Sequence, residues 1–356
     1  MMPSDRVSAR RAIEALRAGV PTSDAIRRLG CPDEGLEIRF EAALDSVADA
    51  TTPGFAVAGG FGTGKSHLLG YLREAALHRD CVVSTVTVSK ETPLSIPGVT
   101  YATAMRNATV RGANDDAITL ALTRIERTEG AVESLELWAS TPEAGIAPVF
   151  QAILYLLTRS TDPELRHAIE AFLADAKPPL PPLRRALKEK RVRTLFDLAP
   201  VAAADLLRQR MRFMPQLFCA AGFAGWVVLL DEVELIGRYG PLQRALAYAE
   251  IAQWLGLHES ARIPCLFAAC AARRSWRTTP CWRCARSRPR RICGRPTTPT
   301  CAAMRLRSAT ATAPPMAGPH RRPRSATARR TAPCVTTFAA GSPSGTCCAL
   351  PASERR

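Results

Sequence analysis

FAVAGGFGTGKSHLL, residues 55–69, is the stretch that decides the fold. An apolar run breaks into a glycine-rich turn and then restarts with helical periodicity, which predicts a strand, a loop and a helix. Gly59, four further residues, then Gly64, Lys65 and Ser66 match the phosphate-binding pattern G-x-x-x-x-G-K-[ST], known as Walker A. We therefore expect this loop to bind the phosphates of a nucleotide.

The residue types of the loop each suit phosphate binding. Glycines let the backbone N–H groups turn inward, and the N-terminus of the following helix adds positive potential. Lys65 is predicted to act on the β- and γ-phosphates as a catalytic residue, and the Ser66 hydroxyl to ligate Mg²⁺. The predicted nucleotide-contacting residues are Gly59, Gly60, Phe61, Gly62, Thr63, Gly64, Lys65, Ser66 and His67. The alternative, a glycine turn with a chance Lys-Ser pair, is disfavoured by the flanking strand and helix.

A second motif, GWVVLLDE at residues 225–232, is a continuously apolar run that ends in two carboxylates. Such a run is typical of a central parallel strand, and ligands bind beyond the carboxyl ends of such strands. It reads as a Walker B strand, in which Asp231 holds Mg²⁺ and Glu232 is the general base for the attacking water. The Asp-Glu pair favours hydrolysis over phosphoryl transfer to a small molecule. The alternative is a strand that ends in solvated acids.

The spacing of the two motifs predicts the domain organisation. Lys65 and Asp231 are 166 residues apart, and the segment between them is mostly helical in pattern, so we expect a helical insertion in an α/β fold with a P-loop NTPase parallel sheet. The predicted parts are a helical leader (1–50), the first part of the core (51–112), a helical insertion (113–222), the Walker B part of the core (223–270) and a tail (271–356). The leader either packs beside the nucleotide or serves as a stabilising cap.

Periodicity and turn residues predict the individual elements. Helices are expected at 6–18, 24–29, 33–48, 101–108, 115–128, 131–139, 146–159, 163–176, 183–190, 201–221 and 241–257, and strands at 55–58, 81–88, 225–232 and 263–269. The last helix is expected to present one apolar face made of Leu242, Ala245, Leu246, Ala249 and Ala252.

The tail differs sharply in composition from the rest of the chain. Residues 271–356 contain 18 Arg, one Glu and neither Lys nor Asp, a net charge of +17, whereas residues 1–270 have 30 basic and 31 acidic residues. The tail also holds 11 of the 28 prolines and few large apolar residues, so it cannot form a packed core. We expect it to be disordered and interpret it as the product of a frameshift in a GC-rich gene. A genuine basic arm is the alternative.

The remaining composition indicates a cytoplasmic protein. The five cysteines before residue 271 are scattered singly in apolar runs, as in a reduced compartment. Residues 1–50 are charged throughout, which excludes a signal peptide, and no apolar run reaches the length of a membrane span.

Three segments together resemble the ATP-binding P-loop proteins of bacterial BREX phage-defence systems. They are RRAIEALRAGVPTSDAIRRLG, the loop GGFGTGKSHLL and GWVVLLDEVELIGRYGPLQRALAYAEIAQWLG, within residues 6–270. The resemblance implies a cytosolic AAA+-type ATPase that uses ATP and Mg²⁺ and works with other phage-defence proteins. It leaves open whether the chain binds DNA or forms a homo-oligomer. The family continues with ordered sequence past the last strand, and this chain does not, so its γ-phosphate sensor cannot be assigned.

Two other functions stay open at this stage. One is an ATP-gated scaffold or regulatory protein with little turnover, and the other is a nonfunctional fragment of a disrupted gene. The intact residues Lys65, Ser66, Asp231 and Glu232 favour ATP hydrolysis, whereas the absent γ-phosphate sensor favours the scaffold.

Overall fold

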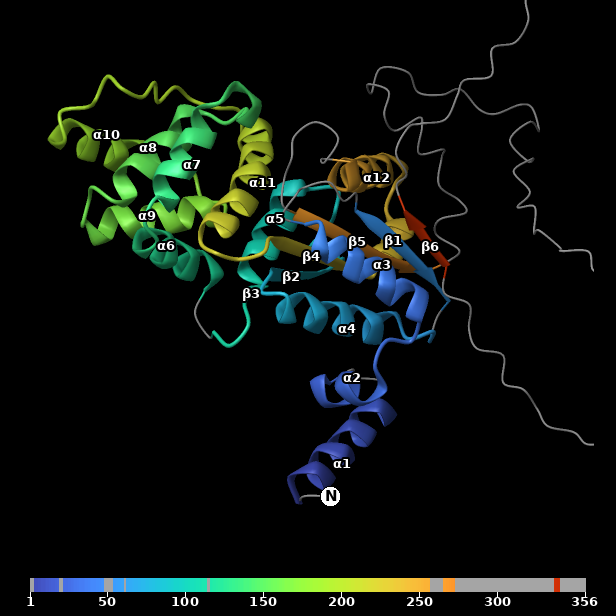
Figure 1. The fold of residues 1–356 in the computed structure, drawn as a ribbon. Coiled ribbons are helices and arrows are strands. Elements are labelled where there is room, and N and C mark those ends of the chain that lie inside the picture. The colour runs from blue at the N-terminus through green and yellow to red at the C-terminus, as the bar shows by residue number, and fades with distance from the viewer. Residues whose placement is uncertain are drawn as a thin grey trace, which may run out of the picture.

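A six-stranded sheet forms the centre of the computed structural model, and helices cover both of its faces (Figure 1). The structure describes residues 3–18, 22–47, 54–60, 62–113, 116–256, 265–272 and 336–339. The strands are β1 (Phe55–Gly59), β2 (Val82–Thr87), β3 (Ala108–Thr109), β4 (Trp226–Asp231), β5 (Cys265–Ala272) and β6 (Thr336–Ala339). The α-helices are α1 (Pro3–Arg17), α2 (Ser23–Leu29), α3 (Glu34–Asp45), α4 (Lys65–His78), α5 (Pro97–Arg106), α6 (Ala117–Arg127), α7 (Ala131–Ser140), α8 (Pro148–Leu157), α9 (Pro163–Ala174), α10 (Leu180–Glu189), α11 (Ala203–Ala220) and α12 (Pro241–Gly256). The 3₁₀ helices are η1 (Pro142–Ala144) and η2 (Val233–Arg238).

The strand order brings the two sequence motifs to one edge of the sheet. The order is β3-β2-β4-β5-β1-β6, in which the central strands β2, β4, β5 and β1 are parallel and the outer strands β3 and β6 are antiparallel to their neighbours. The expected α/β fold with a mostly parallel sheet is thus confirmed. Because β1 and β4 are parallel and only β5 lies between them, their carboxyl ends lie at the same edge.

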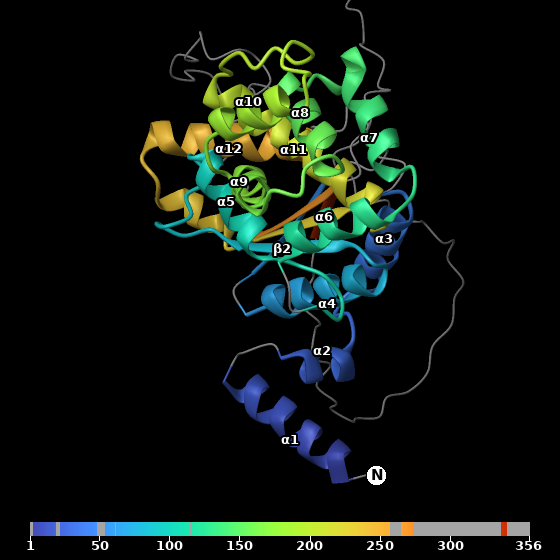
Figure 2. The ribbon, with the colours of Figure 1, turned by 90° about the vertical axis from the view of Figure 1, so that its left-hand side faces the viewer.

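Alternation along β4 explains why helices cover both faces. Val227 and Leu229 pack with α3 and α4, whereas Trp226, Val228 and Leu230 belong to the larger core on the opposite face. Figures 1 and 2 show α4 below the sheet and α12 above it. A strand buried on both faces must be apolar at every position, which accounts for the run WVVLL.

The segment between β3 and β4 is made of helices, and these share their core with the sheet. Helices α6–α10 form a lobe beside the sheet in Figure 1, and α11 leads back to β4. One continuous cluster of buried side chains runs from this lobe to the sheet. One buried hydrogen bond reaches the lobe: the Tyr101 hydroxyl in α5 donates to the Leu173 carbonyl in α9 at 2.7 Å. Another joins two strands of the sheet, where the Trp226 indole N–H in β4 donates to Ser84 Oγ in β2 at 2.9 Å.

Several details differ from the expectations. The strands β3 and β6 and the helix η2 have no counterpart among the predicted elements, and α5 begins four residues earlier than expected, at Pro97. The predicted apolar face of α12 is wrong: Leu242 is 74% exposed and Leu246 50% exposed. The buried side instead carries Ala247, Glu250, Ile251 and Trp254, so the Trp254 indole and the Glu250 carboxylate face the core.

The tail expectation falls mostly outside the described residues. Within 271–356 the structure describes 271–272, the end of β5, and 336–339, which form β6 beside β1. For these residues the structure differs from the predicted disorder. β6 pairs through its main chain with β1 and is therefore the edge strand at the opposite end of the sheet from β3.

The leader packs on the helix that follows the glycine loop. The side chain of Ile26 in α2 fills the space beside Gly70 in α4, where an added Cβ would lie 2.5 Å from the Ile26 Cδ1 atom. In Figure 1, α1 and α2 extend below α4. Among the helices that the structure describes, none combines the length and the apolarity that crossing a bilayer requires.

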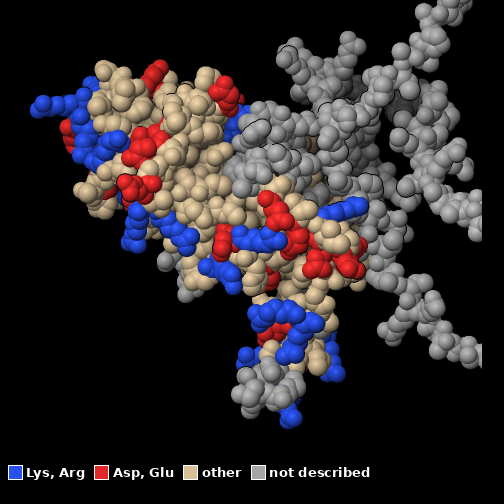
Figure 3. Space-filling view, viewed as in Figure 1, with Lys and Arg blue, Asp and Glu red and all other residues tan. Residues whose placement is uncertain are grey.

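Lys and Arg are mixed with Asp and Glu over the face in Figure 3, and blue side chains gather at the outer end of the helical lobe and on α1 and α2. At the end of the lobe, Arg184 donates to the Leu198 carbonyl at 3.0 Å and Arg185 pairs with Asp162 at 3.4 Å. These basic residues therefore form a solvated helix face with local partners.

Candidate functional site

The glycine loop joins the end of β1 to the start of α4. Gly64 caps α4 in the left-handed region, with φ 86°, a conformation that favours glycine. The Thr63 hydroxyl donates to the Gly60 carbonyl at 2.9 Å, and a Cβ on Gly59 would lie only 2.5 Å from Thr63 Oγ1. A side chain at position 59 would therefore collide with the loop. Of the predicted contact residues, Phe61 lies outside the described part of the chain.

Lys65 turns back over the loop instead of extending into solvent. Its Nζ lies 3.3 Å from the Gly60 carbonyl oxygen and 3.4 Å from the Glu234 Oε1 atom. The Lys65 side chain is 12% exposed and that of Glu234 19% exposed, so the pair is largely shielded from water. The lysine of the loop thus contacts the segment that follows β4.

Ser66 and Asp231 meet although they belong to different motifs. The Ser66 hydroxyl donates to Asp231 Oδ2 at 3.4 Å, and the Glu232 backbone N–H donates to Asp231 Oδ1 at 2.8 Å. Burial is the main cause that raises the pKa of Asp231, and the nearby Glu234 carboxylate acts in the same direction. A carboxylate that lacks full hydration in this way gains most from a cation beside it.

The donor set fits a hard cation. A hydroxyl and a carboxylate oxygen are the ligands that Mg²⁺ prefers, and Mg²⁺ keeps several waters or phosphate oxygens besides its one or two protein ligands. Within the described ranges no cluster of three or more His, Cys, Asp or Glu is arranged to enclose a metal by itself. Ser66 and Asp231 therefore suit a metal that shares its coordination with another ligand.

Glu232 occupies a special backbone position at the start of η2. Its φ is 56°, in the left-handed region that is unfavourable for a residue with a side chain. Such strain at a functional position is retained when the surrounding structure requires it. Burial first, and then the charges of Glu234 and Asp231, raise the pKa of Glu232, so this carboxylate is a better proton acceptor than an ordinary glutamate.

Glu234 is a site residue that the sequence analysis did not single out. Its Oε1 atom faces Lys65, and its Oε2 atom is buried with no hydrogen-bond partner in the part of the chain that the structure describes. The signal in the sequence was a third carboxylate three residues after Asp231, but its place opposite Lys65 depends on how η2 folds.

His67 and Arg238 also lie near the site, and the His67 side chain points away from the loop. The His67 imidazole donates from Nε2 to the Gly30 carbonyl at 3.0 Å, so its side chain joins α4 to the end of α2 and not to the loop. Only the backbone of His67 remains at the start of α4. Arg238, at the end of η2, is exposed.

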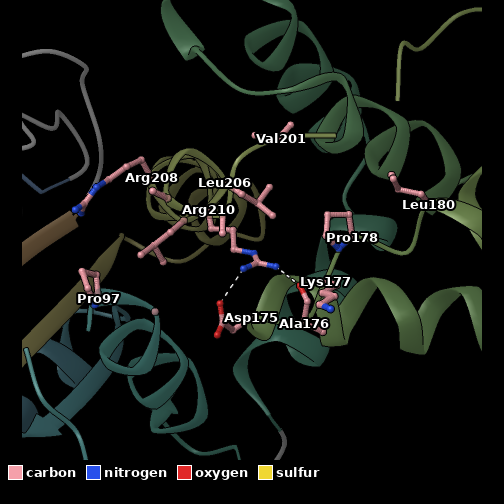
Figure 4. Close-up of a pocket in the computed structure, with 14 residues that line it drawn as sticks. Pro97, Asp175, Ala176, Lys177, Pro178, Leu180, Val201, Leu206, Arg208 and Arg210 are labelled. Atoms are coloured by element: carbon pink, nitrogen blue, oxygen red, sulfur yellow. Dashed lines mark hydrogen bonds and ion pairs between the residues drawn. The ribbon is translucent and has the colours of Figure 1, made fainter. Parts of the chain in front are cut away.

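A separate cavity of about 720 Å³ lies between α5, the α9–α10 connection and α11 (Figure 4). Arg210, 4% exposed, pairs with Asp175 at 2.8 Å and donates to the Ala176 carbonyl. Its guanidinium also lies 4.6 Å from the centroid of the Phe172 ring. Figure 4 shows Arg208 extending on the other side of α11. The lining includes no residue of the glycine loop and none of the carboxylates after β4, so this cavity is distinct from the site.

One family model matches the chain. It is described as "BREX system ATP-binding protein BrxC/D" and matches residues 5–134. The match contains the leader, the glycine loop and β2, and it ends within α7, before β4 and its carboxylates. No curated protein matches the chain.

Proposed function

We propose that this chain binds Mg-ATP at the glycine loop and hydrolyses it to ADP and phosphate as a P-loop ATPase of AAA+ type. The observation that carries the proposal is that Ser66 contacts Asp231, and Lys65 contacts Glu234, at one edge of a parallel sheet, beside Glu232. Nucleotides bind at this edge in open α/β sheets. The similarity of residues 5–134 to BREX ATP-binding proteins supports the choice of ATP.

The residues divide the chemistry among them. Backbone N–H groups of residues 59–67 and the N-terminus of α4 bind the phosphates, and Lys65 neutralises charge on the terminal ones. Ser66 and Asp231 would hold Mg²⁺, which when bound stabilises the charge that develops on the phosphate oxygens. Glu232 orients the attacking water and accepts its proton, a role that its raised pKa favours.

We further propose that the ATPase acts in the bacterial cytoplasm with other proteins of a BREX phage-defence system. The family match supports this context. This proposal does not specify whether the ATPase binds DNA or forms a homo-oligomer. An ATP-gated scaffold with little turnover is the second candidate, which is favoured by the extent of the family match, because the match contains the glycine loop but ends before Asp231 and Glu232.

Nucleotide binding is tested with Lys65→Ala in the full chain. Titration calorimetry with Mg-ATP should show binding to the parent and none to the variant, because the lysine charge and its hydrogen bonds are lost. Lys90→Ala, at an exposed position, is the matched control and should bind like the parent. Equal ATP affinity of Lys65→Ala and the parent would contradict the assigned site. Steady-state phosphate release by the parent then separates an ATPase from a scaffold.

A further inference from the structure

We propose that Glu234 competes with the nucleotide phosphates for Lys65, and so sets the affinity of the site and its dependence on Mg²⁺. This inference rests on the proposed function and assigns a selecting role to a residue outside both motifs. Glu234 is a positioning residue here, because it acts through Lys65 and not on the nucleotide.

The geometry places Glu234 where it must yield to a ligand. Lys65 Nζ lies 3.4 Å from Glu234 Oε1 and 3.3 Å from the Gly60 carbonyl oxygen. An ammonium group has three donors, and two of them now face these acceptors. Lys65 can bind oxygens of both the β- and the γ-phosphate only if it releases one of the acceptors. Binding of a phosphate therefore exchanges one anionic partner of Lys65 for another.

The charges around Lys65 make this exchange sensitive to the metal. Asp231, Glu232 and Glu234 are three carboxylates of one short segment, beside Ser66 and Lys65 of the glycine loop. With Lys65 the four side chains sum to −2 when ionised, which disfavours the entry of free ATP. A nucleotide that carries Mg²⁺ brings part of the compensating charge with it.

The second carboxylate oxygen of Glu234, Oε2, lies in an unfavourable environment when Lys65 pairs with Oε1. Glu234 Oε2 is buried and has no hydrogen-bond partner in the described residues, so Lys65 is the main compensation for this carboxylate. Once Lys65 turns to a phosphate, the Glu234 carboxylate has no cation beside it and still lies near the carboxylates of Asp231 and Glu232. The free energy of this loss opposes nucleotide binding in the parent protein.

Glu234→Gln in the full chain tests the proposal, because it removes the charge and keeps the shape. We expect Mg-ATP to bind roughly threefold to tenfold more tightly than to the parent, the range expected for a partly shielded ion pair. Mg-free ATP should gain more than Mg-ATP, since the site becomes less negative. Glu133→Gln, an exposed glutamate in α7, is the matched control and should leave both affinities unchanged.

An affinity of Glu234→Gln for Mg-ATP equal to or weaker than that of the parent would overturn the proposal. Because Lys65→Ala is expected to bind no ATP, the part played by the lysine is tested without nucleotide, with Lys65→Ala, Glu234→Gln and the double variant. A double-mutant cycle on unfolding without nucleotide measures the pair directly, and zero coupling would also overturn the proposal. If the cycle shows coupling between Lys65 and Glu234 but the parent chain does not bind Mg-ATP, only the proposed function is contradicted.

Discussion

The Ser66 hydroxyl lies 3.4 Å from the Asp231 carboxylate although 165 positions separate the two residues in the chain. The contact exists because β1 and β4 are parallel strands of one sheet, separated only by β5. Protein ligands of Mg²⁺ lie about 2.0–2.1 Å from the ion, so two oxygens at this separation can contact one metal. The helical insertion separates the two residues in the sequence, and the sheet still brings them into contact.

Asp231→Asn should weaken the Mg²⁺ dependence of nucleotide binding. The amide keeps one oxygen that can accept from the Glu232 N–H, and its NH₂ group can donate to the Ser66 hydroxyl, but it lacks the charge that attracts the metal. Titration of Mg²⁺ into the protein with ATP should show a metal affinity lower by about tenfold or more, the scale of losing one charged ligand. Unchanged metal dependence would mean that Asp231 is not a ligand.

Glu232→Gln should keep Mg-ATP binding and lower hydrolysis by about a hundredfold or more, the usual scale for a general base. The glutamine side chain has the same shape but cannot accept the proton of the attacking water. Calorimetry gives the affinity, and phosphate release gives the rate. Glu91→Gln, at an exposed position, should hydrolyse ATP like the parent. If Glu232→Gln turned over at the parent rate, another residue would be the base.

Local patterns in the sequence predicted most elements because their signals are short in range. The glycines and Lys65 determine the loop, and the apolar run before Asp231 determines a strand buried on both faces. The 166-residue separation of Lys65 and Asp231, together with the helical pattern of 113–222, predicted the helical insertion. These features depend on neighbouring residues and need no knowledge of the packing.

Features that depend on packing could not be predicted in this way. The Lys65–Glu234 pair forms only once η2 folds back over the loop, and the side chain of His67 turns to Gly30 because α2 lies there. On α12, small residues repeat at helical spacing on the face that the structure exposes, whereas the buried side is decided by Trp254 and its contact with Glu250. Periodicity indicates that a helix is amphipathic but does not identify its partner.

The arginine-rich tail should give the full chain DNA binding without sequence preference. Its net charge of +17 over residues 271–356 can neutralise phosphates, and such binding falls steeply with salt because counterions are released. Titration of unrelated duplexes between about 50 and 200 mM salt should show equal affinities that fall together by about a hundredfold or more. A preference for one sequence that persists at the higher salt concentration would argue for a reading site and against the frameshift interpretation.

Tyr101→Phe should destabilise the contact between the sheet and the insertion. The Tyr101 hydroxyl is fully buried and donates to the Leu173 carbonyl at 2.7 Å, so the variant leaves that carbonyl without this donor. We expect the free energy of unfolding to fall by about 1–2 kcal/mol in urea denaturation. Tyr155→Phe keeps its ring against Phe196 and serves as the control, with a change below about 0.5 kcal/mol. An equal loss in both variants would show that the hydrogen bond contributes nothing specific.

Arg208→Ala should destabilise the junction between α11 and α12 more than any surface ion pair does. Arg208 makes two hydrogen bonds to Glu250, at 2.8 and 2.5 Å, and the Trp254 indole N–H donates to the same carboxylate. The Glu250 side chain is 5% exposed, so loss of Arg208 leaves a buried charge with one neutral donor. Removing one partner of a buried pair costs about 3–5 kcal/mol, and the 23% exposure of Arg208 places the expected loss near the lower end.

Urea denaturation of the parent and variant measures this loss, and Arg10→Ala, whose partner Glu14 is exposed, should change the stability by less than about 0.5 kcal/mol. The double variant Arg208→Leu with Glu250→Met removes both charges and should recover much of the stability, because no unpaired carboxylate remains buried. α12 follows directly after η2, so the same pair joins the insertion to the segment that carries Glu232 and Glu234. If Arg208→Ala were as stable as the parent, the ion pair would contribute nothing to stability, and the junction would be held by apolar packing alone.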